Sequence, residues 1–170
     1  MSIEDIKQYY SATEHSEIRE DLTYAVSLTG AARVAIDCGC GAGSDIAFLR
    51  QNGFTVHAFD IEEESIRRCR KRYSSDPGVH LSVADFSGFE YPNASLVVAD
   101  ASLFFCPRKE FNFVWSRIEK SLRLEGFFAV RFLDPKIRWQ SRVITDKHFG
   151  QTLRFLLKKK YDSTLLILTF

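Results

Sequence analysis

The feature that most constrains the fold is a short apolar segment that runs directly into a glycine-rich stretch. Residues 34–43 read Val-Ala-Ile-Asp-Cys-Gly-Cys-Gly-Ala-Gly, so Gly39, Gly41 and Gly43 alternate with small residues. Such a segment predicts a buried strand that enters a tight loop. Glycines allow the loop to turn sharply and let a ligand lie against bare main chain. The helix expected next offers free amide groups at its N-terminus.

The rest of the sequence continues this alternation of strands and helices. We expect strands over 34–36, 55–59, 79–83, 95–99, 127–133 and 165–170. We expect helices over 14–28, around 46–49 with closure at Asn52-Gly53, over 62–73, over 109–122, and from Thr145 to near Tyr161. Alternation of this kind predicts an α/β fold, with a mostly parallel sheet and helices on both faces.

The length of 170 residues fits one domain. We divide it into an N-terminal helical lid segment (1–30), a ligand-binding core (31–133) and a shortened C-terminal part (134–170).

Four acidic residues lie at or just past the ends of predicted strands. They are Asp37, Asp60, Asp85 and Asp100. In open α/β sheets, ligands bind outside the carboxyl ends of the strands. The sequence therefore predicts a ligand site at this edge of the sheet.

The residue types at this edge distinguish between two nucleotide cofactors. The dinucleotide spacing G-x-G-x-x-G fails because position 44 is Ser44. Asp37 would repel a pyrophosphate but favour a ligand that carries an ammonium and a sulfonium. Asp60 can accept both hydroxyls of a ribose, which supports a nucleoside without choosing one. Asp85 can accept from an adenine amino group, with Phe86 packed near the ring.

These motifs resemble the class I, Rossmann-like, S-adenosylmethionine-dependent methyltransferase family over roughly residues 30–133. The resemblance implies S-adenosylmethionine as the cofactor, S-adenosylhomocysteine as the product, and no metal. It implies cofactor contacts from Asp37, Gly39, Cys40, Gly41, Gly43, Asp60, Ile61, Asp85, Phe86, Ala101 and Phe104.

One stretch is also similar to the tellurite-resistance branch of that family. Residues 13–17 read Thr-Glu-His-Ser-Glu just ahead of the first expected strand. This resemblance implies a small-molecule acceptor, with an oxyanion such as tellurite as a candidate. Tyr10, His15 and Arg131 are candidate acceptor-site residues. Packing of an N-terminal helix is the structural alternative for the first two, and pairing with a nearby acid is the alternative for Arg131.

The C-terminal part departs from the family pattern. The family closes its sheet with an antiparallel strand pair after the fifth strand, whereas the sequence predicts only one strand there, Leu165–Phe170. An open apolar sheet edge is a liability. We therefore expect either a homodimer that covers this edge or a truncated form. The short C-terminal part does not by itself predict whether the protein catalyses methyl transfer.

Other function classes stay open beside the small-molecule methyltransferase. One is a catalytically silent S-adenosylmethionine-binding protein. Another is a nucleic-acid methyltransferase that uses the basic tail over 131–160, since residues 101–170 hold 14 basic and 6 acidic residues. No Asn-Pro-Pro-aromatic tetrapeptide follows the fourth strand, where Asp100-Ala101-Ser102-Leu103 stands, which argues against nucleic acid. A nicotinamide oxidoreductase is a more distant alternative.

The sequence also predicts the cellular setting. The first twenty residues are polar, and no apolar run approaches the roughly 18 residues that span a bilayer. Cysteines at 38, 40, 69 and 106 show no disulfide spacing. We therefore expect a cytoplasmic protein with no membrane partner, buried thiols and structural roles for His57 and His80.

Overall fold

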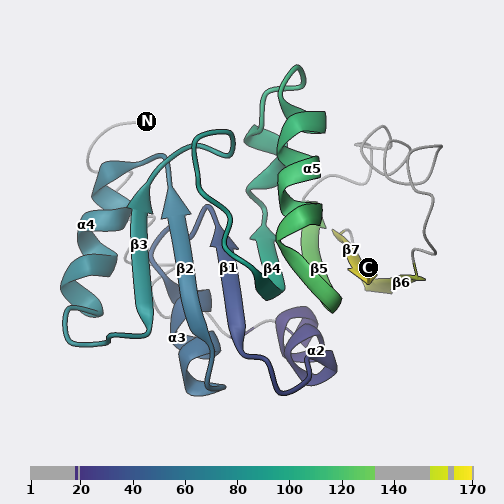
Figure 1. Cartoon of the computed structure of the whole chain (residues 1–170), viewed down its shortest axis with the longest axis horizontal. Helices are drawn as coiled ribbons and strands as arrows, with labels where there is room; N and C mark the ends of the chain where they lie inside the picture. The colour runs from purple at the N-terminus through teal and green to yellow at the C-terminus, as the bar shows by residue number, and fades with distance from the viewer. Residues whose placement is uncertain (1–17, 19, 133–153, 161–162, 170) are drawn as a thin grey trace.

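The computed structural model describes residues 18, 20–132, 154–160 and 163–169. At its centre lies a seven-stranded sheet in the order β3-β2-β1-β4-β5-β7-β6 (Figure 1). The strands are β1 (Val34–Cys38), β2 (Thr55–Asp60), β3 (Val79–Val83), β4 (Ala94–Asp100), β5 (Leu122–Phe132), β6 (Arg154–Lys160) and β7 (Ser163–Thr169). The strands β1 to β5 run parallel, and β7 runs antiparallel to both β5 and β6. This confirms the predicted α/β fold with a mostly parallel sheet.

Helices cover both faces of the sheet, as the sequence predicted. Side chains of α2 (Glu20–Leu28), α3 (Ser44–Gln51) and α4 (Glu63–Arg72) belong to one buried cluster, and those of α5 (Phe111–Ser121) belong to another. Figure 1 shows α5 lying across β4 and β5. None of the helices in the described part of the chain is both long and apolar enough to cross a membrane.

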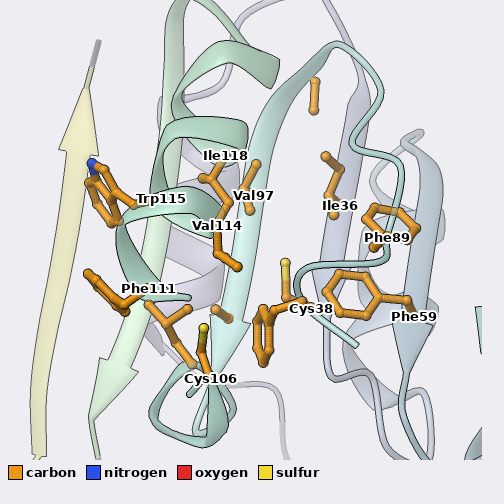
Figure 2. Packing of buried hydrophobic residues seen from close by; sticks show 14 of the residues in the cluster. Ile36, Cys38, Phe59, Phe89, Val97, Cys106, Phe111, Val114, Trp115 and Ile118 are labelled. Atoms are coloured by element: carbon orange, nitrogen blue, oxygen red, sulfur yellow. The ribbon is translucent and has the colours of Figure 1, made fainter. Parts of the chain in front are cut away.

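The packing of α5 follows from its helical periodicity. Phe111, Val114, Trp115 and Ile118 recur on one helical face, and all four are buried (Figure 2). They belong to the same cluster as Val97 in β4. Full burial of an apolar side chain of this size stabilises the fold by about 1.5–3 kcal/mol, so this face fixes α5 on the sheet.

The junction between α5 and β5 differs from the prediction. The sequence pattern placed a break at Glu125-Gly126 and a strand from Phe127, whereas β5 begins at Leu122, directly after the helix. Pairing with β4 starts at Leu122, shifts register, and resumes at Phe127. A glycine within a strand often accompanies such an irregularity, so the Gly126 region is an irregular part of a longer strand.

The C-terminal part corrects a second prediction. Residues 154–160 form strand β6, although the sequence pattern predicted the end of a basic helix there. This strand pairs antiparallel with β7 in the register Lys160↔Ser163 to Arg154↔Thr169. A short apolar run flanked by basic residues is compatible with a helix or with a strand. Residues 154–160 form a strand because they pair with β7. The antiparallel strand pair of the family is therefore present, where the sequence predicted a single strand.

The predicted open apolar edge is also wrong. β7 lies between β5 and β6, so both of its backbone edges are paired. The terminal strand at that end of the sheet is β6, which carries Lys158, Lys159 and Lys160. Lysines on an edge strand are a common device against edge-to-edge pairing. The homodimer prediction therefore loses the observation on which it rested.

A histidine pair joins β2 to β3 near the opposite end of the sheet. His57 and His80 are register partners, and their rings stack with centroids 4.5 Å apart. Burial, and secondarily the neighbouring His80, lowers the pKa of His57 below its ordinary value of 6.5. These contacts agree with the structural role that the sequence predicted for both residues.

This histidine pair predicts a pH dependence of stability. Because the folded state binds the His57 proton more weakly than the unfolded chain does, its stabilising contribution is present above pH 6.5 and is lost as pH falls from there toward the lowered pKa. We expect the free energy of unfolding, measured by urea denaturation, to fall between about pH 7 and about pH 5.5. His57→Gln should flatten that part of the profile, and an unchanged profile would contradict the assignment.

Candidate functional site

The strand order places a topological switch point between β1 and β4. Chain connections leave in opposite directions on either side of this point, and ligands of such sheets bind in the crevice at the carboxyl ends. Asp60 and Asp100 are the last residues of β2 and β4. Asp37 is the penultimate residue of β1, and Asp85 follows β3. The structure thus brings the four predicted acids to one edge.

The glycine loop after β1 has the backbone conformation that its sequence requires. Gly39, Gly41 and Gly43 have φ values of 75°, 51° and 80°, in the left-handed region that side chains disfavour. The backbone amides of Gly39 and Cys40 both donate to the carbonyl of Phe59, at 2.8 and 3.0 Å. The loop is therefore anchored on the end of β2 and leads into α3 at Ser44.

Asp60 connects the glycine loop to the end of β2. Its Oδ2 accepts from the backbone N–H of Gly41 at 2.8 Å, and its Oδ1 accepts from the backbone N–H of Glu62 at 2.9 Å. A carboxylate oxygen has more than one lone pair, so Asp60 can still accept from a ligand hydroxyl. The sequence predicted a ribose contact but gave no sign that Asp60 also holds the loop.

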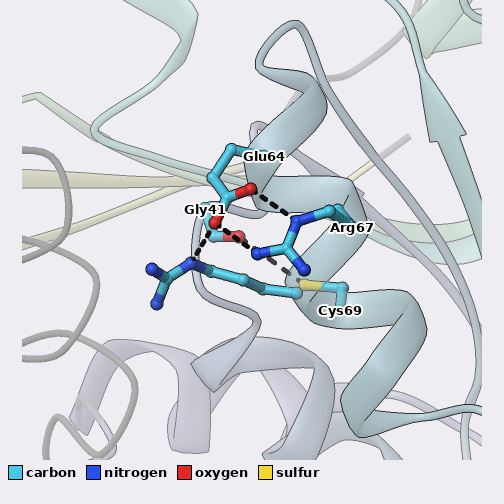
Figure 3. Close-up of polar contacts among 5 residues, drawn as sticks. Gly41, Glu64, Arg67 and Cys69 are labelled. Atoms are coloured by element: carbon cyan, nitrogen blue, oxygen red, sulfur yellow. Dashed lines mark hydrogen bonds and ion pairs between the residues drawn. The ribbon is translucent and has the colours of Figure 1, made fainter. Parts of the chain in front are cut away.

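Helix α4 and the residue after it support the loop from one side, a feature that sequence reasoning missed. Tyr73 Oη donates to the Gly43 carbonyl at 2.7 Å. Cys69 Sγ donates to the Gly41 carbonyl at 3.6 Å, the contact that Figure 3 shows. On the exposed side of α4, Glu64 pairs with Arg67 and Arg68. The loop contacts join residues about 30 positions apart, so no local sequence signal reports them.

Asp37 gives the loop a negative electrostatic environment. Its side chain is buried, with 3% of its surface exposed. A hydrogen bond with Cys69 and burial raise the pKa of the Cys40 thiol, and the charge of Asp37 raises it further. Burial raises the pKa of Tyr73 to about 12, and Asp37 contributes to that shift as well. Arg72 acts in the opposite direction on the pKa of Tyr73, and its Nη1 donates to the Ala42 carbonyl at 3.5 Å. The buried Asp37 therefore places a negative charge beside the loop, and Arg72 places a positive charge on its α4 side.

The segment after β3 carries the predicted adenine contacts. Asp85 is exposed, and its Oδ1 accepts from the backbone N–H of Gly88 at 2.6 Å. Phe86 is buried in the core, where its ring lies edge-on to Phe59 at a centroid distance of 5.4 Å. Arg117 of α5 donates to the Ser87 carbonyl at 2.6 Å and thereby holds this segment. Asp85 is thus presented at the edge, whereas Phe86 packs beneath it.

The turn after β4 places the other predicted pocket residues. Ala101 has a φ of 47°, and η1 (Leu103–Phe105) follows it. The rings of Phe104 and Phe105 lie 4.3 Å apart, and Phe105 is 74% exposed. Ile61, just past β2, is 69% exposed. Apolar groups are therefore exposed after two strands at the same edge.

The three candidate acceptor-site residues are placed less fully. Arg131 lies in β5, in register with Asp100 of β4, and therefore at the same edge of the sheet. Tyr10 and His15 lie outside the described residues. Among the residues that the structure describes, no group of three or more His, Cys, Asp or Glu side chains is arranged to hold a metal ion.

The loop has room for a ligand where the prediction requires it. A Cβ atom built on Gly41 meets nothing within 4 Å, whereas one built on Gly39 or Gly43 meets a neighbouring side chain at 2.6 or 2.9 Å. The main chain at Gly41 therefore faces open space beside Asp60. The exposed main chain at Gly41 and the carboxylate of Asp60 suit the nucleoside of S-adenosylmethionine. The buried carboxylate of Asp37 suits its cationic methionine part.

Comparison with known proteins agrees with this geometry. Residues 35–126 match the family model described as a methyltransferase domain. A carboxy-S-adenosyl-L-methionine synthase of Glaesserella parasuis is 30% identical over 117 residues, which cover 65% of this chain and 47% of that protein. The chain thus spans about half the length of the curated relatives that it matches.

Solved structures share the fold at low sequence identity. TehB from Haemophilus influenzae superposes with a TM-score of 0.71 at 13% identity, over 96% of this chain and 66% of that one. The N-methyltransferase NodS from Bradyrhizobium japonicum, in complex with S-adenosyl-L-homocysteine, superposes with a TM-score of 0.68 at 15% identity, over 96% and 97% of the two chains. More than half of this chain matches the methyltransferase model, and its fold and cofactor motifs agree with that match. The chain therefore belongs to the class I, S-adenosylmethionine-dependent methyltransferase family.

Proposed function

We propose that this chain binds S-adenosylmethionine at the glycine loop and transfers its methyl group to a small-molecule acceptor. The observation that carries the proposal is the open main chain at Gly41, flanked by the carboxylate of Asp60 and the buried Asp37. Asp37 and the loop would hold the methionine part, and Asp60 would hold the ribose. Asp85 and the exposed Ile61 would contact the adenine.

The chemistry asks the protein mainly to position its ligands. The sulfonium of the cofactor supplies an activated methyl group, so no side-chain nucleophile is required. The glycine loop orients the ligand because its amides are fixed to Phe59 and to Asp60. Alignment of the reacting atoms and exclusion of water then account for most of the rate enhancement expected from such a site.

Binding experiments test the first half of this proposal. Isothermal titration calorimetry should detect S-adenosylmethionine and S-adenosylhomocysteine but not NAD, since the negative field of Asp37 opposes a pyrophosphate. Absence of heat with both sulfur cofactors would rule out the proposed site.

An acceptor screen tests the second half. Release of S-adenosylhomocysteine should be measured with a panel of small molecules that includes tellurite, because residues 13–17 resemble the tellurite-resistance branch. Turnover with a structured RNA instead would support the nucleic-acid alternative. Tight cofactor binding without turnover on any acceptor would support a silent binding protein.

The curated relatives favour a second candidate function. They are named carboxy-S-adenosyl-L-methionine synthases, and the one from Glaesserella parasuis matches this chain over 117 residues at 30% identity. A chain with that activity would release a carboxylated cofactor rather than S-adenosylhomocysteine. Mass spectrometry of the cofactor-derived products, and of any ligand that copurifies with the protein, separates the two candidates.

Gly41→Ala tests the location of the cofactor. The φ of 51° is tolerated by alanine at about 1–2 kcal/mol, and the new methyl group meets no protein atom within 4 Å. We therefore expect a folded variant whose affinity for S-adenosylhomocysteine falls by about 10-fold or more, because the methyl group occupies the ligand's place. Gly53→Ala is the matched control, since its φ is 79° and its surroundings are also open. Equal affinities of both variants would place the cofactor elsewhere.

A further inference from the structure

A buried serine ties the turn after β4 to the glycine loop after β1. Ser102 is 7% exposed, and its Oγ donates to the backbone carbonyl of Cys38 at 2.5 Å. Cys38 is the last residue of β1, and Ser102 lies two residues past the end of β4. The hydrogen bond therefore spans the switch point between the two strands.

This contact fixes one peptide group from both sides. The carbonyl of Cys38 accepts from Ser102, and the next amide, that of Gly39, donates to the carbonyl of Phe59 at 2.8 Å. The Cys38–Gly39 peptide, where the glycine loop begins, is thus held by hydrogen bonds from both sides. One is to Ser102, which follows β4, and the other is to Phe59 in β2. Its orientation sets the direction in which the loop leaves the strand, because Gly39 follows with a φ of 75°.

The turn that carries Ser102 is itself tightly held. Ala101 is the one non-glycine residue with positive φ among the described residues. Such strain persists only where the surroundings impose it. Ser102 supplies two constraints, since its hydroxyl bonds to Cys38 and its carbonyl accepts from the amide of Phe105 at 2.9 Å. The same turn carries the exposed ring of Phe105.

We propose that Ser102 is a positioning residue, which orients the Cys38–Gly39 peptide for cofactor binding and couples the turn after β4 to the glycine loop. The proposal rests on the proposed function for its cofactor. Ser102 acts through the backbone of the loop and is not assigned a contact with the reacting atoms.

The chain contains a matched control for this role. Ser95 is also in the β4 region, is 6% exposed, and also bonds to the backbone beside or within β1. Its Oγ lies 2.6 Å from the carbonyl oxygen of Ala32 and 3.0 Å from that of Val34. These contacts lie at the amino end of β1, away from the glycine loop. Ser95 Oγ also accepts from the backbone N–H of Val34 at 3.4 Å. Ser95→Ala therefore removes at least as much side-chain hydrogen bonding as Ser102→Ala does, without touching the site.

Calorimetry on the full chain compares the two variants. Ser102→Ala should weaken S-adenosylhomocysteine binding by about 10-fold, because the Cys38–Gly39 peptide is no longer fixed in the free protein and must be ordered when the ligand binds. Ser95→Ala should change that affinity by less than about 2-fold, although both variants should unfold at lower urea concentration. Wild-type affinity in Ser102→Ala, or equal weakening in both variants, would overturn the positioning role.

Hydrogen exchange gives a readout that does not depend on the cofactor. In Ser102→Ala, the amides of residues 39–43 should exchange faster, whereas Ser95→Ala should accelerate exchange near 32–35. Unchanged exchange at the glycine loop would contradict the positioning role of Ser102, whether or not the wild-type chain binds a sulfur cofactor. Failure of the wild-type chain to bind either sulfur cofactor would reject only the proposed function. Should Ser102→Ala fail to fold, Ser102→Cys takes its place, because a thiol has similar volume and is a weak donor.

Discussion

Replacing Gly39 by alanine is expected to destabilise the fold by about 2–5 kcal/mol, the largest effect of any glycine-to-alanine change considered for this loop. Two penalties add. Alanine at a φ of 75° is strained, and its Cβ would lie 2.6 Å from Cβ of Ser102. The obstructing atom is attached directly to the backbone of a turn that is itself held by hydrogen bonds. It therefore cannot move aside as the end of a long side chain could.

Urea denaturation of Gly39→Ala and Gly53→Ala separates the two penalties. Gly53 has a φ of 79°, but a Cβ there meets nothing within 4 Å. Gly53→Ala should therefore show the backbone strain alone, about 1–2 kcal/mol. The difference between the variants measures the clash with Ser102. Equal losses of stability would mean that the turn after β4 yields, and that the switch point is less rigid than its hydrogen bonds indicate.

Replacing Asp60 by asparagine is expected to give the largest loss of cofactor affinity, about 2–4 kcal/mol or roughly 30- to 1000-fold. The carboxylate uses both oxygens at once, accepting from the amides of Gly41 and Glu62. Asparagine has one acceptor oxygen, so its amide group must face one of these N–H donors. The loop then loses an anchor, and the proposed ribose contact loses an acceptor as well.

Asp76→Asn is the matched control for Asp60. Asp76 also accepts from a backbone amide two residues ahead, that of Gly78 at 2.9 Å, and it pairs with Arg50 at 2.7 Å. The hydrogen bond with Arg50 holds the pKa of Asp76 below its usual range. Because this pair lies just ahead of β3, at its amino end, Asp76→Asn should affect stability and leave calorimetric affinity for S-adenosylhomocysteine unchanged. Similar affinity losses in both variants would show that the Asp60 effect is not local to the site.

The sequence alone was sufficient for the strands and the acids that form the site. Asp60 and Asp85 follow apolar segments whose strand character is clear from composition, so their shared edge followed from parallel pairing. The glycine spacing predicted a loop that turns sharply after β1, and the structure adds the positive φ values that make this turn possible. These features depend only on residues that are adjacent in the sequence, so they can be predicted without knowledge of the tertiary fold.

The C-terminal strands show where local patterning stops. The run Arg154-Phe155-Leu156-Leu157 is compatible with a helix or a strand, and only pairing with β7 makes it β6. The same pairing places β7 inside the sheet, which removes the open edge that the sequence predicted. Paired strands can come from distant segments of the chain, so the stabilisation that one strand gains from its partner cannot be read from a short stretch of sequence.

By itself, then, the sequence determined the α/β class, the loop between β1 and α3, and the acidic edge that suits a cationic nucleoside cofactor. Tertiary structure alone decided what holds that loop in place. Tyr73 and Ser102 reach it from positions about 30 and 60 residues away, and Asp60 anchors it by accepting from the Gly41 amide. Such contacts depend on how elements pack across the switch point, and packing is a property of the assembled sheet rather than of any one segment.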